Sequence, residues 1–229
     1  MKWYDTLLRF PFFQGMNETE LVEIATKTRF DFINVSPKQF IVSKGTACHQ
    51  LLLLSDGEVM VSQEDADGKC QLKERICQPL AIQPERLFGL NQNYSVTIQA
   101  LSKCSLLALN KQEVLKLLSH YMLFQFNMLN FLSTNAQRYR QLLWNTKPEG
   151  VQYKIILFIL NRCLTPNGDK DIKIRLYDLA VEISESRLNV SKALHELQGK
   201  GLLRMNRLHI LVDDMERLSH YADELSSKG

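Results

Sequence analysis

The sequence predicts an α+β protein with an antiparallel β-roll first, a long helix second and a small, mainly helical module third. Three observations predict this order. Apolar residues recur with a period of two in short segments between residues 30 and 109, as in half-buried strands. The period then becomes helical from Lys111 to about Asn145. Beyond a break that contains Pro and Gly, two short helical segments precede a hairpin pattern.

The composition favours a cytoplasmic protein of two domains. The chain has 229 residues, 45% of them hydrophobic, which suffices for two separate cores. Its five cysteines include no CxxC pair, which predicts reduced thiols and neither a disulfide framework nor a metal site. No apolar run reaches about 18 residues and the N-terminus lacks a signal-peptide pattern, so no membrane partner is expected. The net charge of +3 is too small to indicate a partner.

The first domain is predicted at residues 1–110. Asn17 and Glu20 form a capping-box pattern at the start of a helix that precedes the strands. Short strands at intervals of about ten residues, separated by Asp-Gly turns, then predict a sandwich or barrel. Residues 79–94 lack alternation and are expected to form a loop, either plain or ligand-binding. The predicted strands are 30–35, 40–42, 50–54, 58–62, 71–76, 96–100 and 105–109.

The long helix is predicted at residues 111–146 and carries a coiled-coil seam. Seven of its eight seam positions are apolar or aromatic, which is typical of helices that pair. We therefore expect a homodimer through residues 118–143; a core helix of one domain is the alternative. A second stripe of Phe124, Met128 and Phe131 is expected to cover the roll. The seam positions are Leu118, Met122, Gln125, Leu129, Leu132, Ala136, Tyr139 and Leu143.

The third domain is predicted at residues 147–229. Residues 179–197 have two short runs of apolar residues at helical spacing, which indicates two helices joined by a tight turn. A hairpin pattern with its turn near Asn206 follows. Together they predict a winged helix-turn-helix, while the helix pair alone would equally fit an ordinary surface hairpin. The expected buried residues are Leu179, Ala180, Ile183, Val190, Ala193, Leu194 and Leu197.

The charge distribution supports a nucleic-acid partner. Between Arg187 and Arg207 there are five cations and one acid, a local charge of +4 on a nearly neutral chain. Such a patch is expected where a protein docks on phosphates. A helix with a short cationic outward face also fits the DNA major groove.

The order of these elements resembles the Crp/Fnr family of bacterial transcription regulators over nearly the whole chain. The most specific matches are Leu53–Val61 around a glycine turn, Ser186–Lys192 at the start of the second helix, and Gly201 with the two leucines after it. The resemblance implies a cyclic-nucleotide-binding-like jelly roll, a dimerisation helix and a C-terminal winged helix-turn-helix.

The resemblance also implies DNA-contacting residues. Arg187 would donate to a guanine and Lys192 to a base or phosphate, while Ser186 would bind a phosphate. Asn189 would contact a phosphate or an adenine edge. Leu188 departs from the glutamate of the cyclic-AMP receptor protein; it cannot accept a hydrogen bond but can touch a thymine methyl. The full predicted set is Ser186, Arg187, Leu188, Asn189, Ser191, Lys192 and Arg207.

The effector site departs further from the family. Cyclic-nucleotide binders carry a phosphate cassette whose arginine position is held here by Tyr94, and whose glutamate position is held by Pro84 or Glu85. Burying a cyclic phosphodiester without a cation is unfavourable, and Arg86 lies on the wrong side of the cassette. We therefore expect no cyclic-AMP binding, and either an unidentified small-molecule effector or no effector at all. The candidate pocket residues are Glu85, Arg86, Phe88, Gly89, Tyr94 and Ser95.

The leading hypothesis is a homodimeric, sequence-specific transcription regulator that binds a near-palindromic double-stranded DNA operator, with RNA polymerase as a further candidate partner. The alternative is a cyclic-nucleotide- or small-ligand-binding regulatory protein whose C-terminal module contacts protein. An enzyme is not expected, because HExxH, GxSxG and Gly-rich phosphate loops are absent from the sequence. No cofactor is firmly implied, no iron–sulfur cluster is expected, and haem stays open with His49 and Cys77 present.

Overall fold

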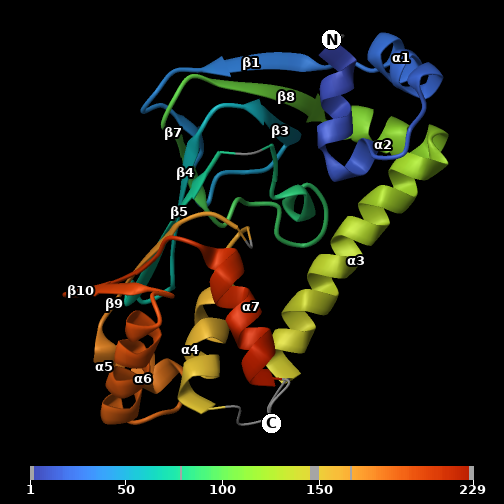
Figure 1. Ribbon diagram of the computed structural model, residues 1–229. Helices are drawn as coiled ribbons and strands as arrows, with labels where there is room; N and C mark the ends of the chain where they lie inside the picture. Colours follow the sequence, from blue (N-terminus) through green and yellow to red (C-terminus); the bar gives the residue numbers. More distant parts are fainter. Residues whose placement is uncertain (1–2, 78, 145–149, 166, 227–229) are drawn as a thin grey trace. The chain divides into compact units, whose positions relative to one another are not determined.

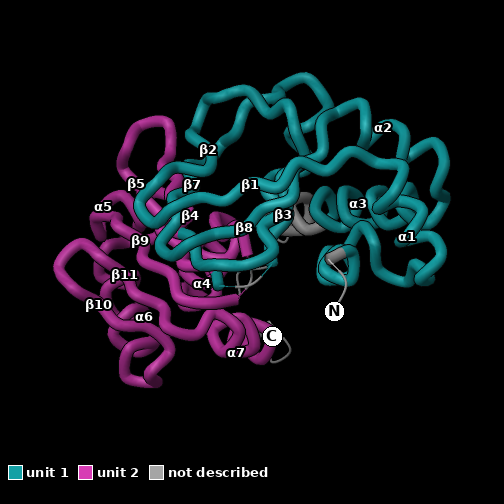
Figure 2. The backbone as a smooth tube through the Cα atoms, turned by 90° about the horizontal axis from the view of Figure 1, so that it is seen from above, with its two compact units in different colours: residues 1–59, 77–138 teal, residues 60–76, 139–229 magenta. Residues whose placement is uncertain are grey.

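The computed structural model describes residues 3–77, 79–144, 150–165 and 167–226. The chain forms two compact units, and each unit is built from two separate stretches of the sequence (Figure 2). The roll unit comprises residues 1–59 and 77–138, and the winged-helix unit comprises residues 60–76 and 139–229. Both contain helices and strands, so the predicted α+β class is confirmed.

The roll unit begins with short helices. These are the 3-10 helices η1 (Trp3–Arg9) and η2 (Pro11–Phe13), followed by α1 (Glu18–Lys27). The predicted capping box is confirmed: the Asn17 side chain accepts from the N–H of Glu20 at 2.9 Å, and the Glu20 carboxylate accepts from the N–H of Asn17 at 3.0 Å. These two bonds satisfy donors that a helix start otherwise leaves free.

A four-stranded antiparallel sheet in the order β1-β8-β3-β6 forms the centre of the roll unit (Figure 1), and β2 pairs with β7. The strands of this unit are β1 (Asp31–Val35), β2 (Phe40–Val42), β3 (Gln50–Asp56), β6 (Leu80–Ile82), β7 (Thr97–Ala100) and β8 (Cys104–Asn110). The prediction of a loop throughout residues 79–94 is wrong at β6, which pairs with β3. Three residues are too few to show alternation. The 3-10 helix η3 (Pro84–Arg86) follows.

The turn after β3 requires glycine. Gly57 has a φ of +102°, and a Cβ at this position would lie 2.6 Å from the carbonyl oxygen of Lys103 and 2.7 Å from the Sγ of Cys104. Lys103 directly precedes β8 and Cys104 is its first residue, so the turn is closely packed as well as left-handed. Glycine alone meets both requirements without strain.

The predicted long helix is broken, which corrects the expectation of one helix over residues 111–146. Helix α2 (Lys111–His120) ends at Tyr121, whose ψ is 100°, and α3 (Met122–Trp144) begins after it. Ser119 and His120 explain the break, since both side chains donate to the carbonyl of Lys116, at 2.9 and 2.8 Å. Such side-chain bonds compete with the helical backbone.

Helix α3 packs on the N-terminal helices through the stripe of Phe124, Met128 and Phe131. This stripe was expected to pack on the roll strands instead. Phe124 and Met128 are buried. The Phe124 ring lies 5.2 Å from that of Phe13, and the Phe131 ring lies 5.2 Å from that of Phe12. The expectation that this stripe covers the roll strands is therefore wrong, because Phe12 and Phe13 pack against it.

The winged-helix unit contains the strands in the order β10-β11-β9-β5-β4 and four helices among its described residues. The strands are β4 (Val59–Glu64), β5 (Cys70–Ile76), β9 (Lys170–Ile174), β10 (Arg204–Asn206) and β11 (His209–Val212). The helices are α4 (Gly150–Leu160), α5 (Leu176–Glu182), α6 (Arg187–Gly199) and α7 (Met215–Ser226). All seven residues predicted to be buried in the helix pair are at most 9% exposed. None of the described helices is both long and apolar enough to cross a membrane.

Candidate nucleic-acid interface

Helices α5 and α6 form the predicted helix-turn-helix. Ser186 starts α6 as its N-cap, because its Oγ accepts a hydrogen bond of 3.1 Å from the N–H of Asn189. The turn before it contains Ser184 with a φ of +54°, a left-handed conformation that is unfavourable for a residue with a Cβ. The tight turn thus fixes the direction in which α6 begins.

The first turns of α6 present most of the predicted DNA-contacting side chains to solvent. Arg187, Leu188, Asn189 and Lys192 are exposed, with Leu188 64% exposed, and Ser191 is half-buried. The structure therefore brings together on one helix the residues that the sequence predicted there.

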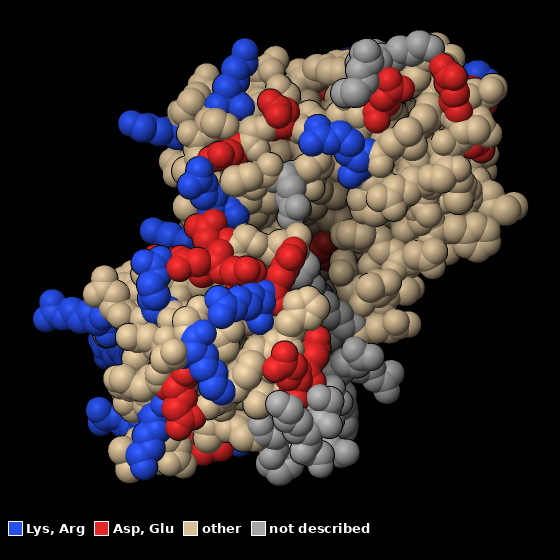
Figure 3. Space-filling view, in the orientation of Figure 1, with Lys and Arg blue, Asp and Glu red and all other residues tan. Residues whose placement is uncertain are grey.

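The charges of this face are available to a partner. Within the described ranges, Arg187, Lys192 and Arg207 form no salt bridge. Arg204 does pair, at 2.6 Å, with Asp213, a carboxylate outside the window from which the local charge was counted. The charge that this face offers to a partner is therefore lower than the +4 counted between Arg187 and Arg207. Figure 3 accordingly shows Lys and Arg side chains mixed with Asp and Glu side chains.

The wing holds Arg207 at its turn. Strands β10 and β11 pair from Arg204 opposite Leu211 to Asn206 opposite His209, and Arg207 follows with a φ of +41°. Left-handed backbone favours glycine or asparagine. Arg207 therefore holds an unfavourable backbone conformation at the turn between β10 and β11.

Two interactions that the sequence did not reveal position α6. Lys154 of α4 donates to Glu185, in the turn before α6, at 2.6 Å. This hydrogen bond, with a weaker one from the Asn189 side chain, lowers the pKa of Glu185 below its ordinary value. At the other end of α6, Lys200 donates to the hydroxyl of Tyr221 and lies over its ring. These partners are far apart in sequence, so no spacing pattern signals them.

A surface cavity of about 410 Å³ lies beside this face, between α4, α6 and α7. Asn189, Lys192 and Lys200 line it together with Glu196 and with Gly150 at the amino end of α4. Two cations and the partial positive charge of a helix amino end favour an anion in this position.

The predicted effector residues lie on η3 and on the loop that precedes β7. Gln83 ties the two segments together: its Nε2 donates to the Oγ of Ser95 at 2.6 Å, and its Oε1 accepts from the N–H of Ser95 at 2.9 Å. Glu85 and Gly89 are exposed, and Phe88 is half-buried beneath the ammonium group of Lys111. Gln83 was not predicted as a site residue, because no sequence pattern marks a left-handed residue in front of a proline.

Tyr94 occupies the position at which the sequence motif of cyclic-nucleotide binders has an arginine. Tyr94 is 5% exposed and hydrogen-bonds Cys48. Burial, with that bond, raises the pKa of Tyr94, so its hydroxyl stays neutral; a phenol supplies no cation in either protonation state. Arg86 is half-buried on η3, and among the described residues its Nε has no hydrogen-bond partner. The Nε of Arg86 is thus a buried donor without a partner among the described residues, and it lies on η3 and not at position 94, which corresponds to the family's arginine.

Comparison with known proteins identifies the fold. The family model of the cyclic nucleotide-binding domain matches residues 32–121. The crystal structure of the catabolite activator protein from Thermus thermophilus superposes with a TM-score of 0.51 at 22% identity, covering 94% of this chain and 100% of that one. DNR from Pseudomonas aeruginosa gives a TM-score of 0.45 at 18% identity, covering 96% and 100%. No curated protein matches the chain.

The chain therefore has the fold of the Crp/Fnr regulators, with a cyclic nucleotide-binding domain at residues 32–121. The resemblance that the sequence motifs predicted is confirmed at this level. At 22% identity, the superposition supports the fold alone. The function has to be argued from the residues of the site.

Proposed function

We propose that the protein is a sequence-specific DNA-binding transcription regulator. The observation that carries this proposal is the exposed amino-terminal face of α6, where Arg187, Asn189 and Lys192 project from a helix whose opposite face is buried. This is the arrangement with which a recognition helix enters a major groove. Arg187 donates to a guanine edge, Leu188 contacts a thymine methyl, and Lys192 contacts a base or phosphate.

Further residues contact the DNA backbone in this proposal. Ser186 has its hydroxyl hydrogen available for a phosphate, because its oxygen is the acceptor in the helix cap. Ser191 lies four positions after Arg187, on the same side of α6, and Arg207 reaches a phosphate from the wing. Phosphate contacts position the protein, while base contacts supply sequence preference.

Binding to random duplex DNA tests this function. At low salt the protein should retard any duplex, and its affinity should fall steeply as salt rises, because each phosphate contact releases counterions. Lys192→Gln should weaken this binding, whereas Lys73→Gln, at an exposed position of β5 and outside the helix-turn-helix, should not. Failure to bind any duplex at low salt would favour a C-terminal module that contacts protein.

Arg207→Asn isolates the contribution of the wing. Asparagine tolerates the left-handed backbone, so the fold should be unchanged while a charge is removed. We expect weaker binding to all duplexes alike, with the slope of log K against log salt smaller by about 0.9 for each phosphate that the protein no longer neutralises. The control is Arg204→Asn, because Arg204 is already paired with Asp213. Equal slopes for Arg207→Asn and wild type would contradict the assignment.

The protein acts as a homodimer through α3 in this proposal. Met122, Phe126 and Leu129 are 72%, 54% and 51% exposed and recur at helical spacing along one side of α3. Large apolar side chains exposed in a row favour a partner helix. Two recognition helices related by a twofold axis then contact a near-palindromic operator, with half-sites about 34 Å apart. Tyr139 and Leu143, also predicted for this seam, have side chains outside the described residues.

Leu129→Glu should weaken the dimer about 10- to 100-fold, because it places two like charges in an apolar seam. Sedimentation at several concentrations measures the change. Asn130→Glu, at an exposed neighbouring position outside the seam, should leave the dimer intact. Identical behaviour of the two variants would contradict dimerisation through this face.

We further propose that the roll binds a small-molecule effector other than cyclic AMP, in the cytoplasm. The unpartnered Nε of Arg86 favours an anionic group. RNA polymerase is the candidate partner through which such a regulator would change transcription. Calorimetric titration with cyclic AMP should show no binding, and a measurable affinity would contradict this part of the proposal.

A further inference from the structure

Helix α6 carries a histidine on its outward side that the proposed DNA contacts do not include. His195 is exposed and lies within the 13-residue helix, two turns after Leu188 and one turn after Ser191. These spacings place the three side chains on one side of α6. The opposite side of α6 is buried in the core of the winged helix. His195 therefore shares a side with residues that the proposed function assigns to DNA.

One nitrogen of the His195 ring is engaged within the helix. Its Nδ1 lies 2.7 Å from the backbone carbonyl oxygen of Ser191. A carbonyl oxygen can only accept, so Nδ1 carries a hydrogen in both protonation states of the ring. A neutral imidazole has a single N–H group, and its Nε2 is then an acceptor without a hydrogen. Among the residues that the structure describes, this Nε2 has no hydrogen-bond partner.

The bond to Ser191 makes the Nε2 of His195 change from acceptor to donor when the ring is protonated. A phosphate diester offers only acceptor oxygens and carries a negative charge. A neutral Nε2 therefore cannot bind it, whereas a protonated Nε2 donates a charge-assisted hydrogen bond. Histidine is the side chain whose charge ordinarily changes between pH 5 and 8. A phosphate contact of His195 would thus form at the acidic end of this range and be lost at the basic end.

The position of His195 along α6 places it at the edge of the groove in the proposed complex. His195 follows Arg187 by eight residues, which is about 12 Å along the helix axis at about 1.5 Å per residue. The major groove is also about 12 Å wide, and the phosphates line its two edges. When the amino end of α6 reaches base edges, a side chain two turns further on lies near the DNA backbone.

We propose that His195 binds a backbone phosphate in its protonated form only, so that the affinity for DNA increases as the pH falls from about 8 to about 6. Where the free ring is neutral, each protomer takes up one proton from the solvent as the contact forms, and the proton stays on Nε2. This inference rests on the proposed DNA binding and adds a response to pH.

No charged group in the described structure engages the His195 ring. On α6 its charged neighbours are Lys192, one turn before it, and Glu196, which accepts from the side-chain amide of Gln152 on α4. His195 has no hydrogen bond or salt bridge with the described parts of α4, α5 or β10, which pack on α6, or with α7, where Tyr221 contacts Lys200. A phosphate beside Lys192 and the protonated ring is therefore attracted by both charges. The charged or titratable residues of α4, α5 and β10 are Tyr153, Lys154, Tyr177, Asp178, Glu182 and Arg204.

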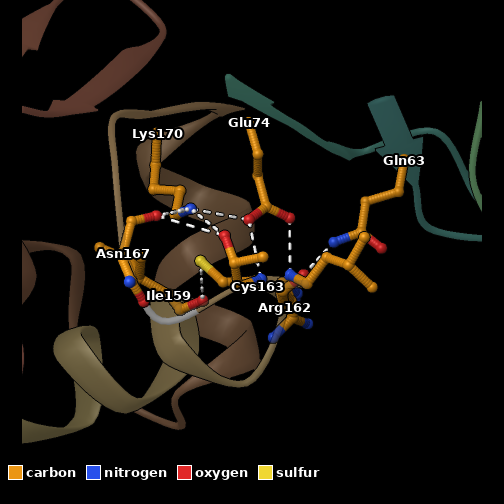
Figure 4. A network of polar contacts seen from close by, with 9 residues as sticks. Gln63, Glu74, Ile159, Arg162, Cys163, Asn167 and Lys170 are labelled. Atoms are coloured by element: carbon orange, nitrogen blue, oxygen red, sulfur yellow. Dashed lines mark hydrogen bonds and ion pairs between the residues drawn. The ribbon is translucent and has the colours of Figure 1, made fainter. Parts of the chain in front are cut away.

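One other histidine contact of the winged-helix unit has to be separated from His195. The Nδ1 of His209 lies 2.6 Å from the carboxylate of Asp171, which joins β11 of the wing to β9. By contrast, the buried ion pair of Glu74 and Lys170 (Figure 4) consists of a carboxylate and an amine, groups that ordinarily keep their charges between pH 5 and 8. The test therefore needs a control variant at His209.

Affinity for one random-sequence duplex at about pH 6 and about pH 8, at equal low ionic strength, tests the contact. Wild type should bind at least about tenfold more tightly at pH 6. His195→Gln has the same charge at both pH values and should lose most of this difference. His195→Lys should bind at pH 8 about as tightly as wild type binds at pH 6. His209→Gln and His220→Gln, which remove histidines from the wing and from α7, should keep the wild-type response.

Proton uptake distinguishes a phosphate contact from a structural role of His195. Calorimetry in buffers of different ionisation enthalpy gives the number of protons bound together with DNA. Near pH 7 the wild-type dimer should take up more protons than the His195→Gln dimer, by up to about two, one for each histidine. A purely structural histidine would change the affinity and leave the proton uptake unaltered.

The outcomes separate this inference from the proposed function. Equal pH responses of wild type and His195→Gln, or equal proton uptake, would overturn the role of His195 while DNA binding itself stands. The same holds if His195→Lys binds no more tightly than His195→Gln at pH 8. Absence of wild-type binding at both pH values would overturn the proposed function and this inference with it.

Discussion

Gly57→Ala is expected to lower the free energy of unfolding of the roll unit by about 4 kcal/mol, the sum of a strained backbone and an overpacked turn. The added Cβ would lie 2.6 Å from the backbone oxygen of Lys103. Backbone cannot swing aside as the end of a flexible side chain can, so β8 or the turn itself must shift. Urea denaturation followed by fluorescence measures the change.

Gly45→Ala is the matched control for this prediction. Gly45 also has a left-handed φ, +86°, but a Cβ there would meet nothing within 4 Å. Only backbone strain remains, which predicts a decrease of about 1–2 kcal/mol. If the two variants lowered the free energy of unfolding by similar amounts, the close contacts of Gly57 with Lys103 and Cys104 would not contribute to the effect.

Arg187→Ala should remove discrimination at one base pair in each half-site, by about 1–3 kcal/mol. Arg187 is exposed at the first position of α6 and has no salt bridge within the described part of the chain. Its guanidinium can therefore donate both hydrogen bonds that a guanine edge accepts. Affinities for the selected operator and for duplexes with single substitutions measure the effect.

The pattern of weakened binding distinguishes base contact from phosphate contact. Arg187→Ala should lower affinity for the operator much more than affinity for a duplex already altered at the guanine. Arg207→Asn provides the contrast, since removing a cation that contacts phosphate weakens binding to every duplex alike. A uniform decrease for Arg187→Ala would contradict its assignment to a base.

Local sequence patterns predicted the helix-turn-helix well. Buried and exposed positions of α6 repeat every three to four residues, so a single stretch of chain defines its faces, and Val190, Ala193, Leu194 and Leu197 are all buried as expected. The cap at Ser186 and the capping box at Asn17 depend on residues three apart. Such features need no knowledge of the rest of the fold.

Interactions between distant segments could not be predicted in this way. The alternation in β5 defines which of its faces is buried but not which strand it pairs with, so its pairing with β9 was not anticipated. The partner of Arg204, Asp213, lay outside the window used to count charge. The break at Tyr121 depends on two side chains that bond one carbonyl, a detail that periodicity does not reveal.

Selection of bound duplexes from a random pool tests the central claim most directly. If α6 is a recognition helix in a twofold dimer, the selected sequences should share a near-palindrome whose half-sites are centred about 10–10.5 base pairs, or a multiple of this, apart. Each half-site should contain a guanine whose enrichment disappears in Arg187→Ala. A pool that shows no enrichment, while the same preparation is folded and dimeric, would contradict sequence-specific DNA binding.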